Sequence, residues 1–229
     1  MGIQNKGLGG LLLLLLGWPI GALAMYFLVS VMQTLREHQL LVKPQKCSFA
    51  QHEIQYLGHI ISAQGVSANP GKISNMVSWS KPTSLKRLQG FLGLIGYYRK
   101  FIKNNGTISV PLTKLLKKGC FEWSMEADVA FAKLKTALTS TPVLTLPDFT
   151  HPFSIECDTS DFGIGGVLTQ DGCPIAFTSK GLVERHRGLS TYEKEMMAIL
   201  HAVGKWRSYL LGRHFTIVIN RSSQHQVYG

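Results

Sequence analysis

The fold of this chain is decided in its second half by the stretch Asp158-Thr159-Ser160-Asp161-Phe162-Gly163-Ile164-Gly165-Gly166-Val167-Leu168. Short runs rich in apolar residues, separated by turn residues, predict strands at Phe153 to Asp158, Gly163 to Thr169 and Pro174 to Ser179. Asp171-Gly172, between the second and third runs, is typical of a two-residue hairpin turn. The sequence therefore predicts three consecutive antiparallel strands.

A long helix and a fourth strand follow these three strands. Thr191 to Leu211 is predicted to be helical, and Phe215 to Ile219 is predicted to be a strand. The order βββαβ is the opening of an RNase H-type domain, and here it stops after the fourth strand. The predicted fold class is α/β (α+β), with a helical region before this truncated domain. The expected core residues of the helix are Met196, Met197, Leu200, Val203 and Leu210.

A sheet that stops after its fourth strand leaves apolar surface uncovered. We therefore expect Met196, Met197, Trp206 and the apolar side of the fourth strand to be partly exposed.

Two carboxylates of this domain are candidate ligands for a divalent metal. Asp158 ends the first predicted strand, and Glu195 lies on the predicted helix. Asn220 follows the fourth strand at a position where a third carboxylate is expected. A two-metal hydrolytic site depends on carboxylate charge, and an amide oxygen brings none. One Asp/Asn difference can therefore separate an active nuclease from a related protein that has lost the activity.

The positive charge of the chain is concentrated in one segment. From Ile54 to Phe121 there are ten lysines and arginines and no acidic residue, whereas the rest has 14 basic and 13 acidic residues. Aromatic residues, including Tyr97 and Tyr98, are interleaved with this basic block. Such a surface suits the phosphate backbone of a nucleic acid, and a solvated basic face is the alternative.

The first part of the basic block is predicted to contain a turn and two helices. Gln55 to Ser62, with Gly58 inside it, indicates a bent strand or hairpin. Pro70 to Trp79 is predicted to be helical. Thr83 or Ser84 can cap a second helix that runs to about Lys103.

One face of the second helix is unusual in composition. Gln89, Gly93 and Tyr97 are spaced four residues apart and therefore share a face. Gly93 and Gly96 leave room for another backbone to approach closely. That backbone is either a neighbouring helix or a ligand.

The amino-terminal segment is strongly apolar. Leu11 to Met32 contains no charged residue in 22 positions and opens with six leucines, a length and composition that suit a membrane-spanning helix. The alternative is a segment acquired by chance from a fused or mispredicted reading frame. Leu28 to Leu40 is predicted to form a short amphipathic helix.

Several short motifs occur in order along the chain, and each alone is weak. They are Leu57-Gly58-His59, Phe91-Leu92-Gly93-Leu94, Tyr97-Tyr98-Arg99-Lys100-Phe101, Pro111-Leu112-Thr113-Lys114-Leu115-Leu116, Pro142-Val143-Leu144, Leu189-Ser190-Thr191-Tyr192-Glu193-Lys194-Glu195 and Trp206-Arg207-Ser208-Tyr209-Leu210-Leu211-Gly212-Arg213. As a set, from about Leu28 to Ser223, they resemble the reverse transcriptase of gypsy-type LTR retrotransposons.

The resemblance implies a division into four parts. Residues 1–27 lie outside it, 28–80 resemble the end of the palm, 81–121 a basic thumb and connection region, and 122–229 a truncated RNase H-like domain. The hairpin then resembles the primer-gripping hairpin, and the helix from Ser84 to Lys103 resembles the thumb helix that lies along a duplex minor groove. The nucleic-acid-binding residues implied are Gly58, His59, Lys86, Arg87, Gln89, Gly93, Tyr97, Arg99 and Lys100.

The resemblance also implies roles in catalysis. Asp158 and Glu195 correspond to catalytic carboxylates that bind Mg²⁺ or Mn²⁺, and Asn220 is a degenerate third catalytic position. Two such ions activate water and stabilise the leaving 3′ oxygen. The polymerase motif Tyr-x-Asp-Asp lies upstream of the matching region and is absent here. DNA synthesis is therefore not expected of this chain.

Three functional hypotheses follow. The leading one is a retrotransposon-derived fragment that binds RNA/DNA hybrid or duplex nucleic acid and has lost catalysis. The first alternative is an active metal-dependent RNase H-type endonuclease of a retroelement polyprotein. The second alternative is a membrane-anchored interaction protein. The family is intracellular, and a membrane location follows only if Leu11 to Met32 inserts.

Overall fold

The computed structural model describes residues 19–43, 47–48 and 51–219, and the chain divides into two units, Met1–Gln51 and His52–Gly229. In the first unit, helix α2 (Pro19–Glu37) is continuous, so the prediction of a separate helix from Leu28 to Leu40 is wrong. The helix can begin at a proline because the missing N–H would have no helical partner in the first turn.

The predicted membrane span falls partly on this helix. Among the residues that the structure describes, no helix has both the length and the apolar character that crossing a bilayer requires. The leucine-rich part of the predicted span, residues 11–18, lies outside the described residues.

The second unit begins with a small antiparallel sheet of three strands, β1 (Glu53–Tyr56), β2 (His59–Ser62) and β3 (Gly65–Ala68). Its first turn is the predicted hairpin, with Leu57 and Gly58 both in the left-handed region (φ 46° and 77°). A two-residue turn with positive φ at both positions matches the twist of the flanking strands. The hairpin is therefore confirmed, whereas β3 was not predicted.

Six helical segments follow, and three of them (α3, α4 and α7) have a side-chain cap at their start. They are α3 (Pro70–Val77), α4 (Leu85–Tyr98), the 3₁₀ turn η2 (Arg99–Phe101), α5 (Asn105–Ile108), α6 (Val110–Lys114) and α7 (Met125–Thr139). Ser84 accepts a hydrogen bond from the amide of Arg87, which confirms it as the cap of α4. Helix α7 was not predicted.

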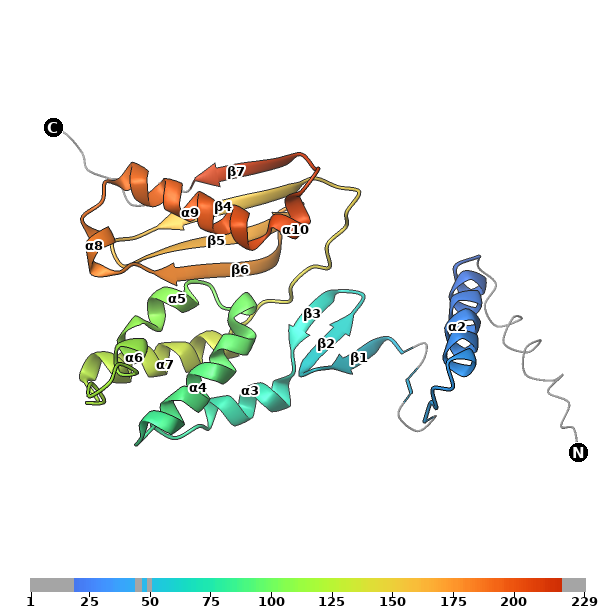
Figure 1. The fold of residues 1–229 in the computed structure, drawn as a ribbon, viewed down its shortest axis with the longest axis horizontal. Helices are drawn as coiled ribbons and strands as arrows, with labels where there is room; N and C mark the ends of the chain where they lie inside the picture. Colours follow the sequence, from blue (N-terminus) through green and yellow to red (C-terminus); the bar gives the residue numbers. More distant parts are fainter. Residues whose placement is uncertain (1–18, 44–46, 49–50, 220–229) are drawn as a thin grey trace, which may run out of the picture. The chain divides into compact units, whose positions relative to one another are not determined.

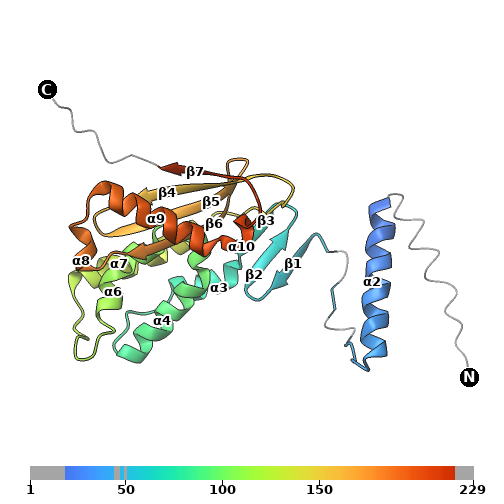
Figure 2. The same cartoon turned by 45° about the horizontal axis from the view of Figure 1, so that its top comes forward.

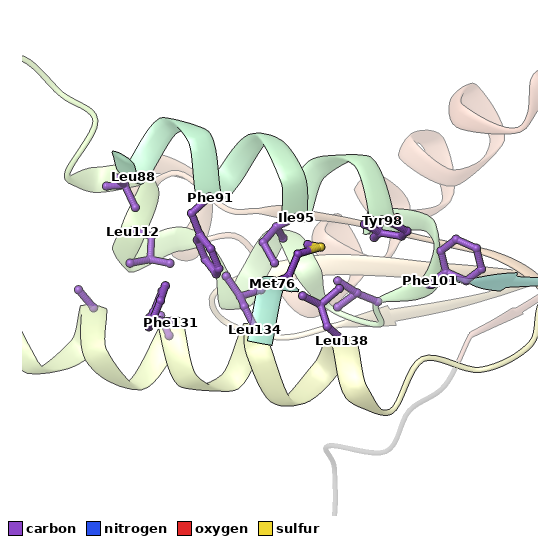
Figure 3. Close-up of a cluster of buried hydrophobic side chains, with 14 of the residues drawn as sticks. Met76, Leu88, Phe91, Ile95, Tyr98, Phe101, Leu112, Phe131, Leu134 and Leu138 are labelled. Carbon is purple, nitrogen blue, oxygen red and sulfur yellow. The ribbon is translucent and has the colours of Figure 1, made fainter. Parts of the chain in front are cut away.

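The helical region is held together by a core between α4 and α7. Leu88, Phe91 and Ile95 on α4 point toward Phe131 and Leu134 on α7 (Figure 3). All five are less than a tenth exposed, and the rings of Phe91 and Phe131 lie 4.5 Å apart between centroids. The core fixes which face of α4 is turned inward and which is left free.

The carboxyl-terminal part is a four-stranded sheet in the order β6-β5-β4-β7 (Figure 1). Strands β4 (Phe153–Thr159), β5 (Gly163–Gln170) and β6 (Cys173–Gly181) are antiparallel, and β7 (Phe215–Ile219) is parallel to β4. Asp171 and Gly172 form the predicted turn, with φ 51° and 77°. The predicted βββαβ order is confirmed.

Helix α9 (Thr191–Lys205) lies across this sheet in both views, between the short helices α8 (Glu184–Arg187) and α10 (Arg207–Leu210) (Figures 1 and 2). The predicted helix from Thr191 to Leu211 is thus interrupted at Trp206.

The buried face of α9 differs from the predicted one. Met196 and Leu200 are 55% and 65% exposed, so their assignment to the core is wrong and the expected exposure of Met196 is confirmed, whereas Ala198 and Ala202 are buried. The reason is a close approach to the sheet: a Cβ on Gly166 of β5 would lie 3.3 Å from the Cβ of Ala202. Trp206, expected to be partly exposed, is buried in the same contact, at 3% exposure.

The helical region and the sheet meet at α5, which lies beside β6 (Figure 1). The amide of Gly106 on α5 donates a hydrogen bond to Ser179 Oγ on β6, at 2.7 Å. A Cβ at Gly106 would lie 2.6 Å from the Ser179 carbonyl oxygen and 2.9 Å from the Cα of Lys180. The two segments thus approach backbone to backbone, and a side chain at position 106 has no room.

We predict that Gly106→Ala destabilises the second unit. Backbone atoms cannot move aside as a flexible side chain can, so we expect a loss of about 1–3 kcal/mol in the free energy of unfolding. Urea denaturation followed by circular dichroism measures it. Gly204→Ala is the control, because a Cβ there meets nothing within 4 Å. The control should be stabilised by about 0.5–1 kcal/mol, as Gly→Ala usually is inside a helix. Equal effects of the two substitutions would contradict the packing account.

Candidate nucleic-acid interface and carboxylate site

Two consecutive tyrosines at the end of α4 fasten the β1–β2 turn to the helix. The hydroxyl of Tyr97 donates a hydrogen bond to the carbonyl of Leu57, and the hydroxyl of Tyr98 donates one to the carbonyl of Gly58 at 3.0 Å. Burial, and secondarily the neighbouring Tyr97, raises the pKa of Tyr98, so its phenol stays protonated as a donor. A Cβ on Gly58 would lie 2.8 Å from the Tyr98 hydroxyl, so the close contact requires glycine there.

His59 completes this contact from β2. Its ring stacks on Tyr97 with 5.2 Å between centroids and meets Tyr98 and Phe101 at 5.5 and 5.3 Å. Burial, and then the charge of Lys100, lowers the pKa of His59, so the ring is neutral at pH 7. Gly58, His59 and Tyr97, predicted separately to bind nucleic acid, are therefore brought together, and they hold the hairpin against α4.

The outer face of α4 is open. Gln89, Gly93 and Gly96 are exposed, and a Cβ on either glycine would meet nothing within 4 Å. The alternative explanation for these glycines, close packing of another helix, therefore finds no such helix in the described part of the chain. Each glycine lowers the stability of a helix by about 1 kcal/mol relative to alanine. Gly93 and Gly96 therefore destabilise α4, and no packing contact among the described residues compensates for the loss.

Basic residues lie at both ends of this face. Lys86 and Arg87 are exposed in the first turn of α4, and Arg99 is exposed just after its last turn. Lys100 is partly buried, with its ammonium 5.0 Å from the ring centroid of Phe101, and burial lowers its pKa. These residues form a strip with cations at each end, which we call the α4 strip: Lys86, Arg87, Gln89, Gly93, Gly96 and Tyr97 on the helix, with Arg99 and Lys100 just after it.

The candidate carboxylates lie on β4 and α9, where β4 ends and α9 begins (Figure 1). Asp158 is the next-to-last residue of β4 and is partly exposed, and Glu195 is in the second turn of α9 and is 8% exposed. Between these elements Lys194 reaches from α9 to Asp161, with 3.0 Å from Nζ to Oδ1. Glu193 is exposed, and its carboxylate accepts a hydrogen bond from the Ser190 amide at the start of α9, so it serves as part of the helix cap.

The donors at this end do not fit a two-metal centre. No group of three His, Cys, Asp or Glu side chains able to hold a metal occurs among the described residues. The third predicted position, Asn220, lies outside them, and strand β7 is described only to Ile219, which pairs with Cys157 beside Asp158. An amide at position 220 would add an oxygen and no charge, whereas paired Mg²⁺ ions depend on carboxylate charge.

Two functional positions were missed from the sequence. Lys194 is buried at 7% exposure and lies four residues before Ala198 on the sheet-facing side of α9. Tyr98 continues the buried spacing of Leu88, Phe91 and Ile95. Helical periodicity could have indicated that Lys194 and Tyr98 are buried, because residues three or four apart share a face.

Comparison with known proteins agrees with this architecture. A family described as "RNase H-like domain found in reverse transcriptase" matches residues 123–217. The retrovirus-related Pol polyprotein from transposon 297 of Drosophila melanogaster is 41% identical over 86% of this chain, which is 18% of that polyprotein. An uncharacterized mitochondrial protein of Arabidopsis thaliana is 50% identical over 56% of this chain and 83% of its own length.

Solved structures show the same fold. The foamy viral protease-reverse transcriptase in complex with RNA/DNA hybrid matches 86% of this chain with a TM-score of 0.79 at 22% identity. The same enzyme in complex with dsDNA matches 87% with a TM-score of 0.78. The matched parts are 28% and 43% of those chains.

Fold, motifs and relatives together define the carboxyl-terminal region of a reverse transcriptase with its RNase H-like domain. The chain belongs to the gypsy/Ty3-type retrotransposon Pol polyprotein family. It spans about a fifth of the length of the Pol polyproteins that it matches, 18% for transposon 297 and 20% for gypsy.

We predict that Tyr98→Phe loosens the hairpin contact. The substitution removes one hydrogen bond to a partly buried carbonyl and should lower the free energy of unfolding by about 1 kcal/mol. Thermal or urea unfolding measures it, with Tyr192→Phe as the control, because Tyr192 is 75% exposed. Unchanged stability of Tyr98→Phe would mean that the hydroxyl does not hold the turn.

Proposed function

We propose that this chain binds duplex nucleic acid, RNA/DNA hybrid in particular, through the α4 strip. The main support for the proposal is the pair Gly93 and Gly96 on α4. These positions are open and have no side chain, so the groove of a duplex can come close to the helix backbone. Cations at both ends of the strip can contact the phosphates on either side of that groove. The foamy viral protease-reverse transcriptase structures are complexes with RNA/DNA hybrid and with dsDNA, which supports the same class of ligand.

The charge of the chain favours this function over a solvated basic face. The formal net charge is +11, and the acid-free segment from Ile54 to Phe121 contains the whole α4 strip. Contacts of lysine and arginine with phosphates release counterions, so affinity should fall steeply with salt and depend little on sequence. A merely solvated face would give weak binding to any polyanion, without a preference for helical geometry.

We propose further that the carboxylate end does not hydrolyse RNA. Family membership implies divalent metal use, with Asp158 and Glu195 as the residues that would hold a cation, Mg²⁺ or Mn²⁺. Only these two carboxylates correspond to the family's ligands, and the neutral Asn220 takes the third position. The active endonuclease remains the competing function.

We predict opposite changes in stability and binding for Gly93→Ala. The free energy of unfolding should rise by about 0.5–1 kcal/mol, since the new methyl group meets open space and alanine favours the helix. Affinity for a labelled hybrid, measured by fluorescence anisotropy, should fall, since the methyl group stands between the groove and the backbone. Gly204→Ala should gain similar stability without losing affinity. Stabilisation of Gly93→Ala with unchanged affinity would exclude the α4 strip as the contact surface.

We predict no cleavage of a 5′-labelled RNA/DNA hybrid in Mg²⁺ or Mn²⁺. Asp158→Asn should bind the hybrid as the unchanged chain does. Product analysis on a denaturing gel measures the cleavage. Cleavage by the unchanged chain that disappears in Asp158→Asn would establish the endonuclease and overturn the loss of hydrolysis, while leaving the binding proposal standing.

A further inference from the structure

A cavity of about 580 Å³ lies within the second unit, where the end of α4, the start of α5, strand β6 and the α9–α10 segment meet. The polar side chains that matter in its wall are Arg99, Lys100, Asn105, Thr178, His201 and Lys205. They come from four separate elements, so the folded unit, and no single motif, assembles the site.

The cavity carries uncompensated positive charge. No aspartate or glutamate lines it, and none of Arg99, Lys100 and Lys205 is in an ion pair with another described residue. Burial, and then the charges of Lys180 and Lys205, lowers the pKa of His201, as expected where cations gather without an anion. Burial also lowers the pKa of Lys100.

Neutral polar side chains lie beside these cations. Thr178 Oγ1 on β6 lies 3.1 Å from His201 Nε2 on α9, so these two side chains already satisfy each other. The lining is therefore cationic and holds no carboxylate, which suits an anionic ligand.

We propose that this cavity holds one backbone phosphate of the bound duplex. A phosphate supplies the negative charge that the three cations lack. The proposal rests on the proposed function and extends it, because Gly96 and Tyr97 belong both to the α4 strip and to the wall of the cavity. A strand that follows α4 therefore reaches the cavity directly, and the duplex contacts β6 and α9 beyond the helix.

The first test uses Lys205→Gln, which neutralises an exposed cation of the cavity. Binding of a fluorescein-labelled duplex of about 20 base pairs is measured by anisotropy over a range of KCl concentrations. Loss of one phosphate contact should reduce the slope of log K against log salt by about 0.9 and weaken binding about tenfold at low salt. Lys118→Gln is the matched control, because Lys118 is exposed and does not line this cavity.

The second test locates the phosphate. Single methylphosphonate linkages, which remove the charge of one phosphate, are placed in turn along the duplex. At the phosphate that occupies the cavity, a methylphosphonate should weaken duplex binding by the unchanged chain. The same linkage should cause no further loss of affinity in Lys205→Gln. Additive losses at every position, or a salt slope of Lys205→Gln equal to that of Lys118→Gln, would overturn the cavity proposal alone.

Two further outcomes separate the proposals. If the unchanged chain binds no duplex at any salt concentration, the proposed function fails and this inference fails with it. If inorganic pyrophosphate at constant ionic strength binds the control but not Lys205→Gln, while every methylphosphonate effect is additive, the cavity takes a free anion and not the backbone, and this inference fails. Urea unfolding of each variant confirms that the fold is retained.

Discussion

The backbone contact between α5 and β6 is the constraint on which the second unit depends. Gly106 lies so close to Ser179 that neither segment can slide without breaking the hydrogen bond between them. A Cβ on Gly181 at the end of β6 would similarly lie 2.4 Å from a side-chain carbon of Val110. Close-packed interfaces of this kind have few alternative arrangements. The helical region and the sheet are therefore held in one register, and Asn105, next to Gly106, is fixed in the wall of the cationic cavity.

In the β1–β2 hairpin, aromatic residues make the packing contacts with the end of α4. A sequence with Tyr97, Tyr98 and Phe101 among lysines suggests stacking on nucleic-acid bases, yet these rings contact His59 and one another. Aromatic side chains bury large areas, and a tyrosine hydroxyl also finds a partner when buried. The rings thus hold the turn against α4, while the helix backbone and the cations are left for the ligand.

The sequence predicted those features that local patterns determine. The strands of the RNase H-like domain and the Asp171-Gly172 turn follow from alternation and turn chemistry, and the cap at Ser84 follows from its position. The buried face of α9 could not be predicted in this way, because it depends on Gly166 in another strand. Helix α7 has a readable pattern in Ala127, Ala130, Phe131, Leu134 and Leu138, all buried, and was overlooked. The cationic cavity has no local signal, since four elements assemble it.

An ion pair within the protein ties the carboxylate end together. Glu195 is buried, and so is the adjacent Lys194, which pairs with Asp161 in the β4–β5 turn. A buried charge is costly unless an opposite charge lies near it, so the ammonium of Lys194 links the start of α9 to the turn after β4. The nucleic-acid binding proposed for the α4 strip draws on other residues and therefore does not require hydrolysis at this end.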